Sequence, residues 1–88
     1  MATILSKEQC NRIASIRSKI RQLNCDDWMC EGSDLPGYCC NALFNNELDQ
    51  FFLADYRGNI IDARDVTITP VLRELARLYG EIRLICNE

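Results

Sequence analysis

The chain has 88 residues, a length that suits one compact domain and is short for two. Hydrophobic residues make up 48% and charged residues 26%, which is ordinary globular usage and excludes a disordered or collagen-like polymer. No apolar run approaches the roughly 18 residues that a membrane span requires. We therefore expect a single globular domain over residues 1–88.

The net charge of −3 is distributed unevenly. Residues 1–23 carry five basic side chains against one acidic, whereas residues 24–69 carry nine acidic against two basic. This segregation predicts either a solvated surface of mixed sign or an acidic surface that meets a basic partner. The N-terminal residues turn polar after five positions, so we expect no secretory signal and a location in the reducing cytoplasm.

Residues 6–23 predict the first helix. Ser6 and Gln9 have the spacing of a capping box, and Asn24 is a plausible stop because it tolerates the left-handed conformation. Two faces follow from the helical spacing. The apolar stripe consists of Ile13, Ile16, Ile20 and Leu23. The basic face consists of Arg12, Arg17, Lys19 and Arg21.

Residues 25–42 lose periodicity and predict a Cys-rich irregular loop. Two local alternatives remain open in this region. One is a short helix that begins at Pro36 and runs through Phe44. The other is a strand over residues 38–44, which would add to the sheet.

The second half of the chain predicts a hairpin, a helix and a strand. Residues 49–56 pair with 59–66 around Gly58, and residues 66–68 extend the second strand. Thr69 and Pro70 begin a helix that Gly80 ends, and the alternation over 82–86 predicts a closing strand. The predicted fold class is α+β, with two helices packed on an antiparallel sheet of three to four strands and a Cys-rich irregular loop.

Six cysteines allow several chemistries. Cys10 and Cys86 lie in apolar periodic stretches, so we expect both to be buried as small hydrophobes. The remaining four could converge on structural zinc, remain free thiols or form disulfides. Adjacent cysteines could both bind one ion only on a turn or a helix, which weighs against zinc. The four are Cys25, Cys30, Cys39 and Cys40.

Catalytic chemistry has little support. The chain has no histidine to activate a nucleophile, and the carboxylates around the central cysteines should raise a thiol's pKa. The four glycines are too scattered to cradle a phosphate. We therefore expect a protein that is not an enzyme and needs no cofactor beyond the zinc considered above.

The acidic centre of the chain is the predicted partner-binding region. Trp28 either folds back onto the sheet or stands exposed among carboxylates as an interface anchor. The leading interpretation is a small cytoplasmic inhibitor or modulator that docks on a basic, and in one version nucleic-acid-binding, surface of a larger protein. Phage-encoded antagonists of host defence share this size and charge, which is an analogy only. The candidate binding residues are Asp26, Asp27, Trp28, Glu31, Asp34 and Tyr38.

Two alternatives stand beside this interpretation. In the first, zinc holds the cysteine loop and the basic face of the first helix contacts nucleic acid, although a pI near 4.9 makes direct nucleic-acid binding unfavourable. In the second, the apolar stripe of the first helix forms the seam of a structural homodimer, for which two heptads are short.

Overall fold

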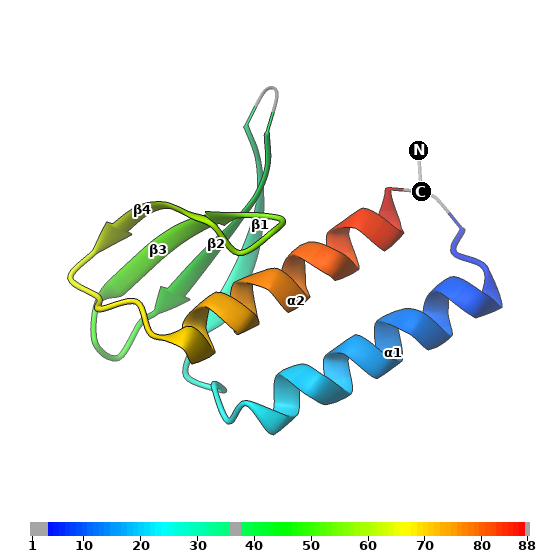
Figure 1. The fold of residues 1–88 in the computed structure, drawn as a ribbon, viewed down its shortest axis with the longest axis horizontal. Helices are drawn as coiled ribbons and strands as arrows, with labels where there is room; N and C mark the ends of the chain where they lie inside the picture. The colour runs from blue at the N-terminus through cyan, green and yellow to red at the C-terminus, as the bar shows by residue number, and fades with distance from the viewer. Residues whose placement is uncertain (1–3, 36–37, 88) are drawn as a thin grey trace.

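The computed structural model of the chain describes residues 4–35 and 38–87, and of residues 32–35 and 38–40 it describes the backbone only. It shows an α+β domain with a four-stranded antiparallel sheet in the order β1-β2-β3-β4, which confirms the predicted fold class apart from the loop (Figure 1). No helix in the described part of the chain has the length and apolarity needed to cross a bilayer. The elements are α1 (Lys7–Gln22), β1 (Met29–Leu35), β2 (Tyr38–Asn45), β3 (Gln50–Asp55), β4 (Ile60–Arg64) and α2 (Pro70–Cys86).

Helix α1 begins and ends where its sequence predicts. The Ser6 hydroxyl accepts from the Gln9 amide at 3.1 Å, and the Gln9 side chain accepts from the Ser6 amide at 2.8 Å. This reciprocal pair satisfies two amide groups that the first turn leaves without helical partners. At the other end Leu23 is the C-cap, and Asn24 takes the left-handed conformation with a φ of 55°.

Helix α2 begins at the predicted place but extends beyond the predicted end. The Thr69 hydroxyl accepts from the Leu72 amide, and Pro70 occupies the first turn. Gly80 does not end the helix, and residues 82–86 form its last turns, so the predicted closing strand is wrong. A Cβ at Gly80 would lie 2.7 Å from the Cα of Tyr56, so this glycine permits a close approach to the β3–β4 turn.

The predicted irregular loop is largely a pair of strands. β1 pairs with β2 along its whole length, from Met29 opposite Phe44 to Leu35 opposite Tyr38. The strand predicted over residues 38–44 is therefore confirmed, and the alternative helix from Pro36 is wrong. β1 lies at the edge of the sheet, and its backbone is hydrogen-bonded to β2. It lacks the alternation of apolar and polar residues by which sequence reasoning recognises a strand.

The predicted hairpin is present as β3 and β4, with a tight turn between them. The Asp55 carboxylate accepts from the amides of Arg57 at 2.8 Å and Asn59 at 2.9 Å, and Gly58 has a φ of 82°. β4 ends at Arg64, so residues 66–68 do not extend it as predicted. A register shift at Leu53 and Ala54 marks a bulge in this pair.

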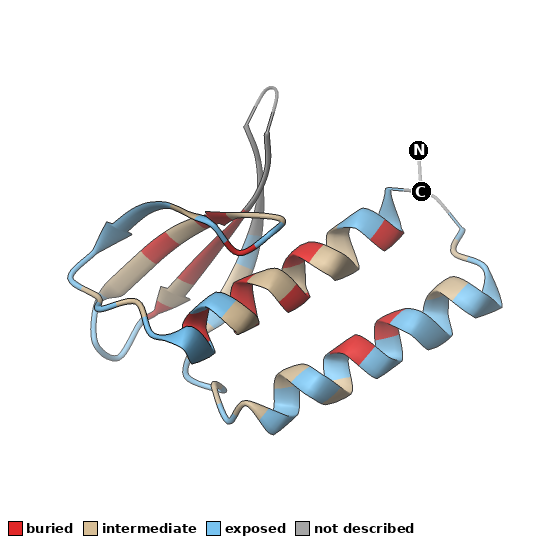
Figure 2. Ribbon diagram, viewed as in Figure 1, coloured by how far each residue is buried: buried red, intermediate tan, exposed pale blue. Residues whose placement is uncertain are grey.

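The core has two parts that meet along α2. On the sheet side, residues of β2 and β3 pack against the first turns of α2; on the other side, the stripe of α1 packs against its later turns, as the buried positions in Figure 2 show. α1 and α2 run antiparallel, and the Gln9 side chain donates to the Ile85 carbonyl at 3.3 Å. The sheet-side cluster comprises Leu43, Phe52, Ala54, Leu72, Leu75 and Ala76. The helix-side cluster comprises Ile13, Ile16, Leu78 and Ile85.

Cys10 and Cys86 are exposed, contrary to the prediction that both are buried. At the start of α1 the buried stripe continues through Gln9, which is partly buried, and not through Cys10. In the last turn of α2 it runs through Ile85, one position before Cys86. One residue corresponds to about 100° around a helix, so each thiol turns away from the helix–helix contact.

Candidate functional site

The turn that joins α1 to β1 presents two neighbouring carboxylates, Asp26 and Asp27. A backbone hydrogen bond of 3.0 Å from the Trp28 amide to the Cys25 carbonyl closes this turn. Both aspartates are exposed, and among the described residues neither forms an ion pair or a side-chain hydrogen bond. Within α2, by contrast, Arg77 forms ion pairs with Glu74 and Glu81. The two aspartates therefore remain available to an external cation.

Trp28 packs on the sheet, as the first of its two predicted alternatives required. Its indole meets the Phe52 ring edge-on, with centroids 5.2 Å apart and ring planes at 65°. The side chain is partly buried against the sheet-side cluster. Trp28 thus anchors the turn whose tip carries Asp26 and Asp27.

The first residues of β1 alternate between the two faces of the sheet. Cys30 is partly buried against the sheet-side cluster, whereas Met29 and Glu31 are exposed on the opposite face. Met29 is 59% exposed. It lines a hollow of about 220 Å³ together with Glu31, Phe44 and Asn46. Glu31 also has no ion pair among the described residues.

Asp34 and Tyr38 are described by their backbone only. Asp34 is in β1 opposite Cys39, and Tyr38 begins β2 opposite Leu35. Asp34 is three positions after Glu31, which is about 10 Å along a strand. Of the six predicted binding residues, three therefore precede β1, two lie in it and one begins β2: Asp26, Asp27 and Trp28, then Glu31 and Asp34, then Tyr38. Among those whose side chains the structure describes, Asp26, Asp27 and Glu31 are the exposed carboxylates.

The four cysteines considered for zinc fall on different elements. Cys25 is in the turn after α1, Cys30 is in β1, and both are free thiols. Cys39 and Cys40 are consecutive backbone positions of β2 and not of the turn or helix that joint ligation requires; their side chains lie outside the described part. Among the residues whose side chains the structure describes, no group of three potential ligands gathers at one point.

The thiols described in this region are poor nucleophiles. Burial, followed by the charges of Asp26 and Asp27, raises the pKa of Cys25. Burial raises the pKa of Cys30 to about 11, while the nearby Arg83 lowers it by a smaller amount. A thiol with a raised pKa carries little thiolate at neutral pH, so neither group is activated for covalent catalysis.

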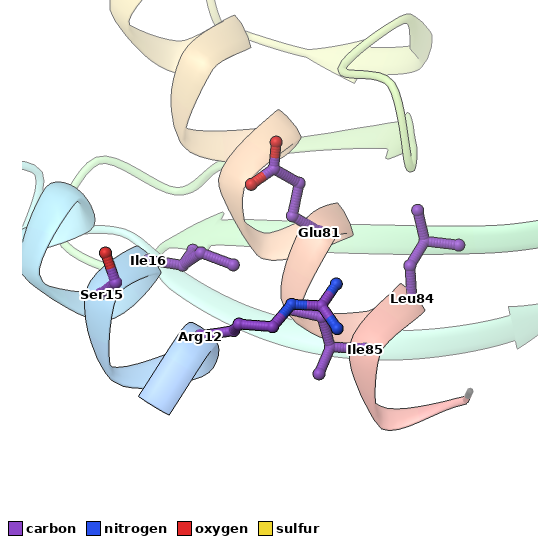
Figure 3. Close-up of a pocket in the computed structure, with 6 residues that line it drawn as sticks. All are labelled: Arg12, Ser15, Ile16, Glu81, Leu84 and Ile85. Atoms are coloured by element: carbon purple, nitrogen blue, oxygen red, sulfur yellow. The ribbon is translucent and has the colours of Figure 1, made fainter. Parts of the chain in front are cut away.

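A hollow of about 390 Å³ lies between the two helices. Figure 3 shows its apolar floor, formed by Ile16 and Ile85, with Arg12 from α1 and Glu81 from α2 at its sides. Glu81 is already bound by Arg77. We therefore assign this hollow to the packing of the helices.

The structure also shows an apolar surface that sequence reasoning missed. Phe52 and Ala54 point to the core, so their neighbours Phe51 and Leu53 lie on the other face of β3, away from the helices. The signal was present in the run Phe51–Ala54, which is apolar at every position, whereas a strand covered on one face normally alternates.

Comparison of the chain with protein-family models, with curated proteins and with solved structures finds no match. Function must therefore be argued from the surfaces described above. The turn and the start of β1 combine exposed carboxylates, which form no ion pair with described residues, with an exposed methionine. Charged and apolar side chains of this kind occur together at protein interfaces.

Proposed function

We propose that this chain is a small non-enzymatic binding protein whose acidic surface, defined as Asp26, Asp27 and Glu31, docks on a basic surface of a larger protein. The observation that carries the proposal is the exposure of three carboxylates that form no ion pair with described residues. Charges that stabilise a fold are usually paired or placed at helix ends of opposite sign. Asp26 and Asp27 instead follow the negative end of α1.

The packing of Trp28 gives the acidic surface a fixed geometry. An indole held against Phe52 restrains the turn, so the neighbouring carboxylates are presented with little conformational freedom to lose on binding. Met29 lies between the turn and Glu31 and contributes apolar area. An apolar centre with a charged rim is the usual anatomy of a protein interface.

The charge of this surface gives the interaction its expected character. Complementary potentials accelerate encounter and fix orientation, and salt weakens them. Basic protein surfaces commonly bind nucleic acid, so a compact acidic protein seated on one would occlude it. Inhibition by occlusion is therefore the mode of action that we propose, in the cytoplasm.

Charge reversal tests the proposal. The variant Asp26→Lys/Asp27→Lys/Glu31→Lys should lose the partner that the wild-type chain retains in a pull-down from its native host, while its circular dichroism stays unchanged. With the purified partner, wild-type affinity should fall as salt rises, because the contact is electrostatic. The same partner bound with unaltered affinity by the triple variant would refute the assignment.

A matched control separates the position of the charge from the total charge. Asp26→Asn/Asp27→Asn and Glu8→Lys change the net charge equally, and all three residues are exposed. The first variant should weaken binding, whereas Glu8→Lys, at the far end of α1, should leave it within about threefold of wild type, since distant exposed charges are largely screened. Equal losses for both variants would mean that net charge alone governs binding.

A further inference from the structure

The sheet has one covered face and one open face. Both helices lie on the same side, and α2 packs against Leu43 and Phe52 (Figure 1). The opposite face, which we call the open face, is not covered by any element of residues 4–35 and 38–87. A four-stranded sheet usually has polar side chains on a face that remains in water. This open face instead has aromatic and aliphatic side chains at its centre.

The strand register arranges the open face in two rows. The first row runs across all four strands as Met29, Phe44, Phe51 and Arg64. The second row runs parallel to it as Glu31, Ala42, Leu53 and Asp62. Each row therefore has an apolar centre, and the two residues of the rows on β4 have opposite charges.

Contacts within the first row make it a continuous ridge. The rings of Phe44 and Phe51 lie 5.0 Å apart, and the Arg64 guanidinium lies 6.0 Å from the centre of the Phe51 ring. The second row lies lower at its centre, because Ala42 is small and only 7% exposed among longer neighbours. Neither Arg64 nor Asp62 forms an ion pair with a described residue.

We propose that the open face binds a second copy of this chain, through a twofold axis that lies between the two rows and runs across the strands. This axis places the first row of one copy on the second row of the other. The ridge of each copy then fits the depression of the other, and Arg64 of each copy lies beside a carboxylate of the other. By symmetry each contact occurs twice in the dimer. The central pairs are Phe44 on the partner's Ala42, Phe51 on the partner's Leu53 and Arg64 beside the partner's Asp62.

Charge selects this axis over the other twofold arrangement of two stacked sheets. An axis parallel to the strands would place β1 over the partner's β4, so that Glu31 would face the partner's Asp62. Like charges at an interface oppose association. The axis across the strands gives attraction at β4 and keeps each copy's acidic turn, with Asp26 and Asp27, at the rim.

The expected dimer is weak and depends on concentration. Four strands spaced about 4.8 Å apart, with two rows of side chains, bury on the order of 1,000 Å² in the pair, the low end for a specific interface. Stacked sheets pack about 10 Å apart, which aromatic side chains can fill. This surface shares Met29 and Glu31 with the acidic surface of the proposed function, but its central pairs lie on β2, β3 and β4. The dimer is therefore tested at Arg64 and Asp62, which lie outside the acidic surface.

A charge swap tests the pairing. Sedimentation equilibrium up to about 1 mM, a range suited to a small interface, should show a monomer–dimer equilibrium for the wild-type chain. Arg64→Asp and Asp62→Arg should each raise the dissociation constant about tenfold or more, because each change makes both symmetric contacts repulsive. The double variant Arg64→Asp/Asp62→Arg should return to within about threefold of wild type, since the attraction is restored.

Two further variants make the result decisive. Phe44→Glu should abolish the dimer, whereas Lys19→Asp, a charge reversal on the exposed side of α1, should leave it unchanged. Circular dichroism confirms that each variant is folded. A wild-type chain that stays monomeric over the whole concentration range overturns the inference. It does so even if Phe44→Glu impairs binding to another protein, because the open face would then serve a different partner. A dimer whose dissociation constant does not change in Arg64→Asp and Asp62→Arg overturns the inference as well.

Discussion

The Cys30 thiol lies on the covered face of β1, at the position that pairs with Leu43. Its ordinary pKa of 9.0 rises to about 11 in the folded chain because of burial. As pH increases, the unfolded chain loses this proton first. The thiol's contribution to stability is therefore full below pH 9 and is lost as pH rises from 9 towards 11.

Cys30→Ala should remove this part of the alkaline loss of stability. We expect the wild-type urea midpoint to fall more steeply between pH 9 and pH 11 than that of the variant. Burial, followed by the charge of Cys30, raises the pKa of Tyr79, which contributes to the fall in both proteins. The difference between them therefore reports the Cys30 thiol together with its effect on Tyr79. Identical pH slopes would show that Cys30 does not titrate differently in the folded chain.

Sequence reasoning identified the acidic residues individually but not their arrangement. Composition and spacing pointed to Asp26, Asp27 and Glu31, and the structure places all three on the surface. The same reasoning left Trp28 open between core and surface, because an indole in a polar segment has no local pattern that reveals its tertiary contact. Its packing on Phe52 depends on residues 24 positions apart along the chain, which periodicity does not report.

At the scale of elements, signals confined to one turn predicted well and signals that depend on distant contacts did not. The capping box of Ser6, the Thr69–Pro70 start and the hairpin around Gly58 are local, and each is present. Gly80 was wrongly predicted to end α2, because glycine commonly ends helices. Here it is inside the helix, where it permits the close approach of Tyr56. β1 was missed because its ladder with β2 compensates for a composition poor in strand formers.

Gly80→Ala tests this explanation of α2. Alanine favours a helix interior by about 1 kcal/mol over glycine, so propensity alone predicts stabilisation. The added Cβ would lie 2.7 Å from the Cα of Tyr56 and 2.8 Å from its carbonyl carbon, which are backbone atoms without room to move. We expect a net loss of about 1–3 kcal/mol in urea unfolding.

Ser15→Ala is the matched control for this change. It lies in α1 at an exposed position, where alanine gains propensity and meets no backbone. Its free energy of unfolding should stay the same or rise slightly. Stabilisation by Gly80→Ala to the same extent would show that α2 and the β3–β4 turn are not in close contact.

At the scale of the whole molecule, the adjacent residues Phe51 and Phe52 lie on opposite faces of the sheet. Phe52 is fully buried in the sheet-side cluster, whereas Phe51 is partly exposed on the open face. A chain of this length has a net stability of roughly 4–13 kcal/mol. Phe52→Ala should remove about 3–5 kcal/mol, enough to unfold a domain at the low end of that range.

Phe51→Ala should cost less than half as much when both variants are measured by urea unfolding at a concentration that keeps the chain monomeric. Phe52→Leu keeps most of the buried volume and gives an intermediate value if Phe52→Ala fails to fold. Equal costs for the two alanine variants would contradict the assignment of Phe51 to the open face. The comparison thus tests the surface on which the dimer depends, without reference to self-association.

Because α2 lies between the sheet and α1, neither can bury its apolar face until α2 has been synthesised. It follows every other element in chain order, and its 17 residues take roughly 1–3 s to translate at about 5–20 residues per second. Until it emerges, the nascent chain on the ribosome exposes Leu43 and Phe52 of the sheet and the stripe of α1 that contains Ile13 and Ile16. An mRNA truncated within the codons for α2 would yield a chain in which the apolar faces of the sheet and of α1 both stay exposed. Chaperones and proteases would recognise such a chain.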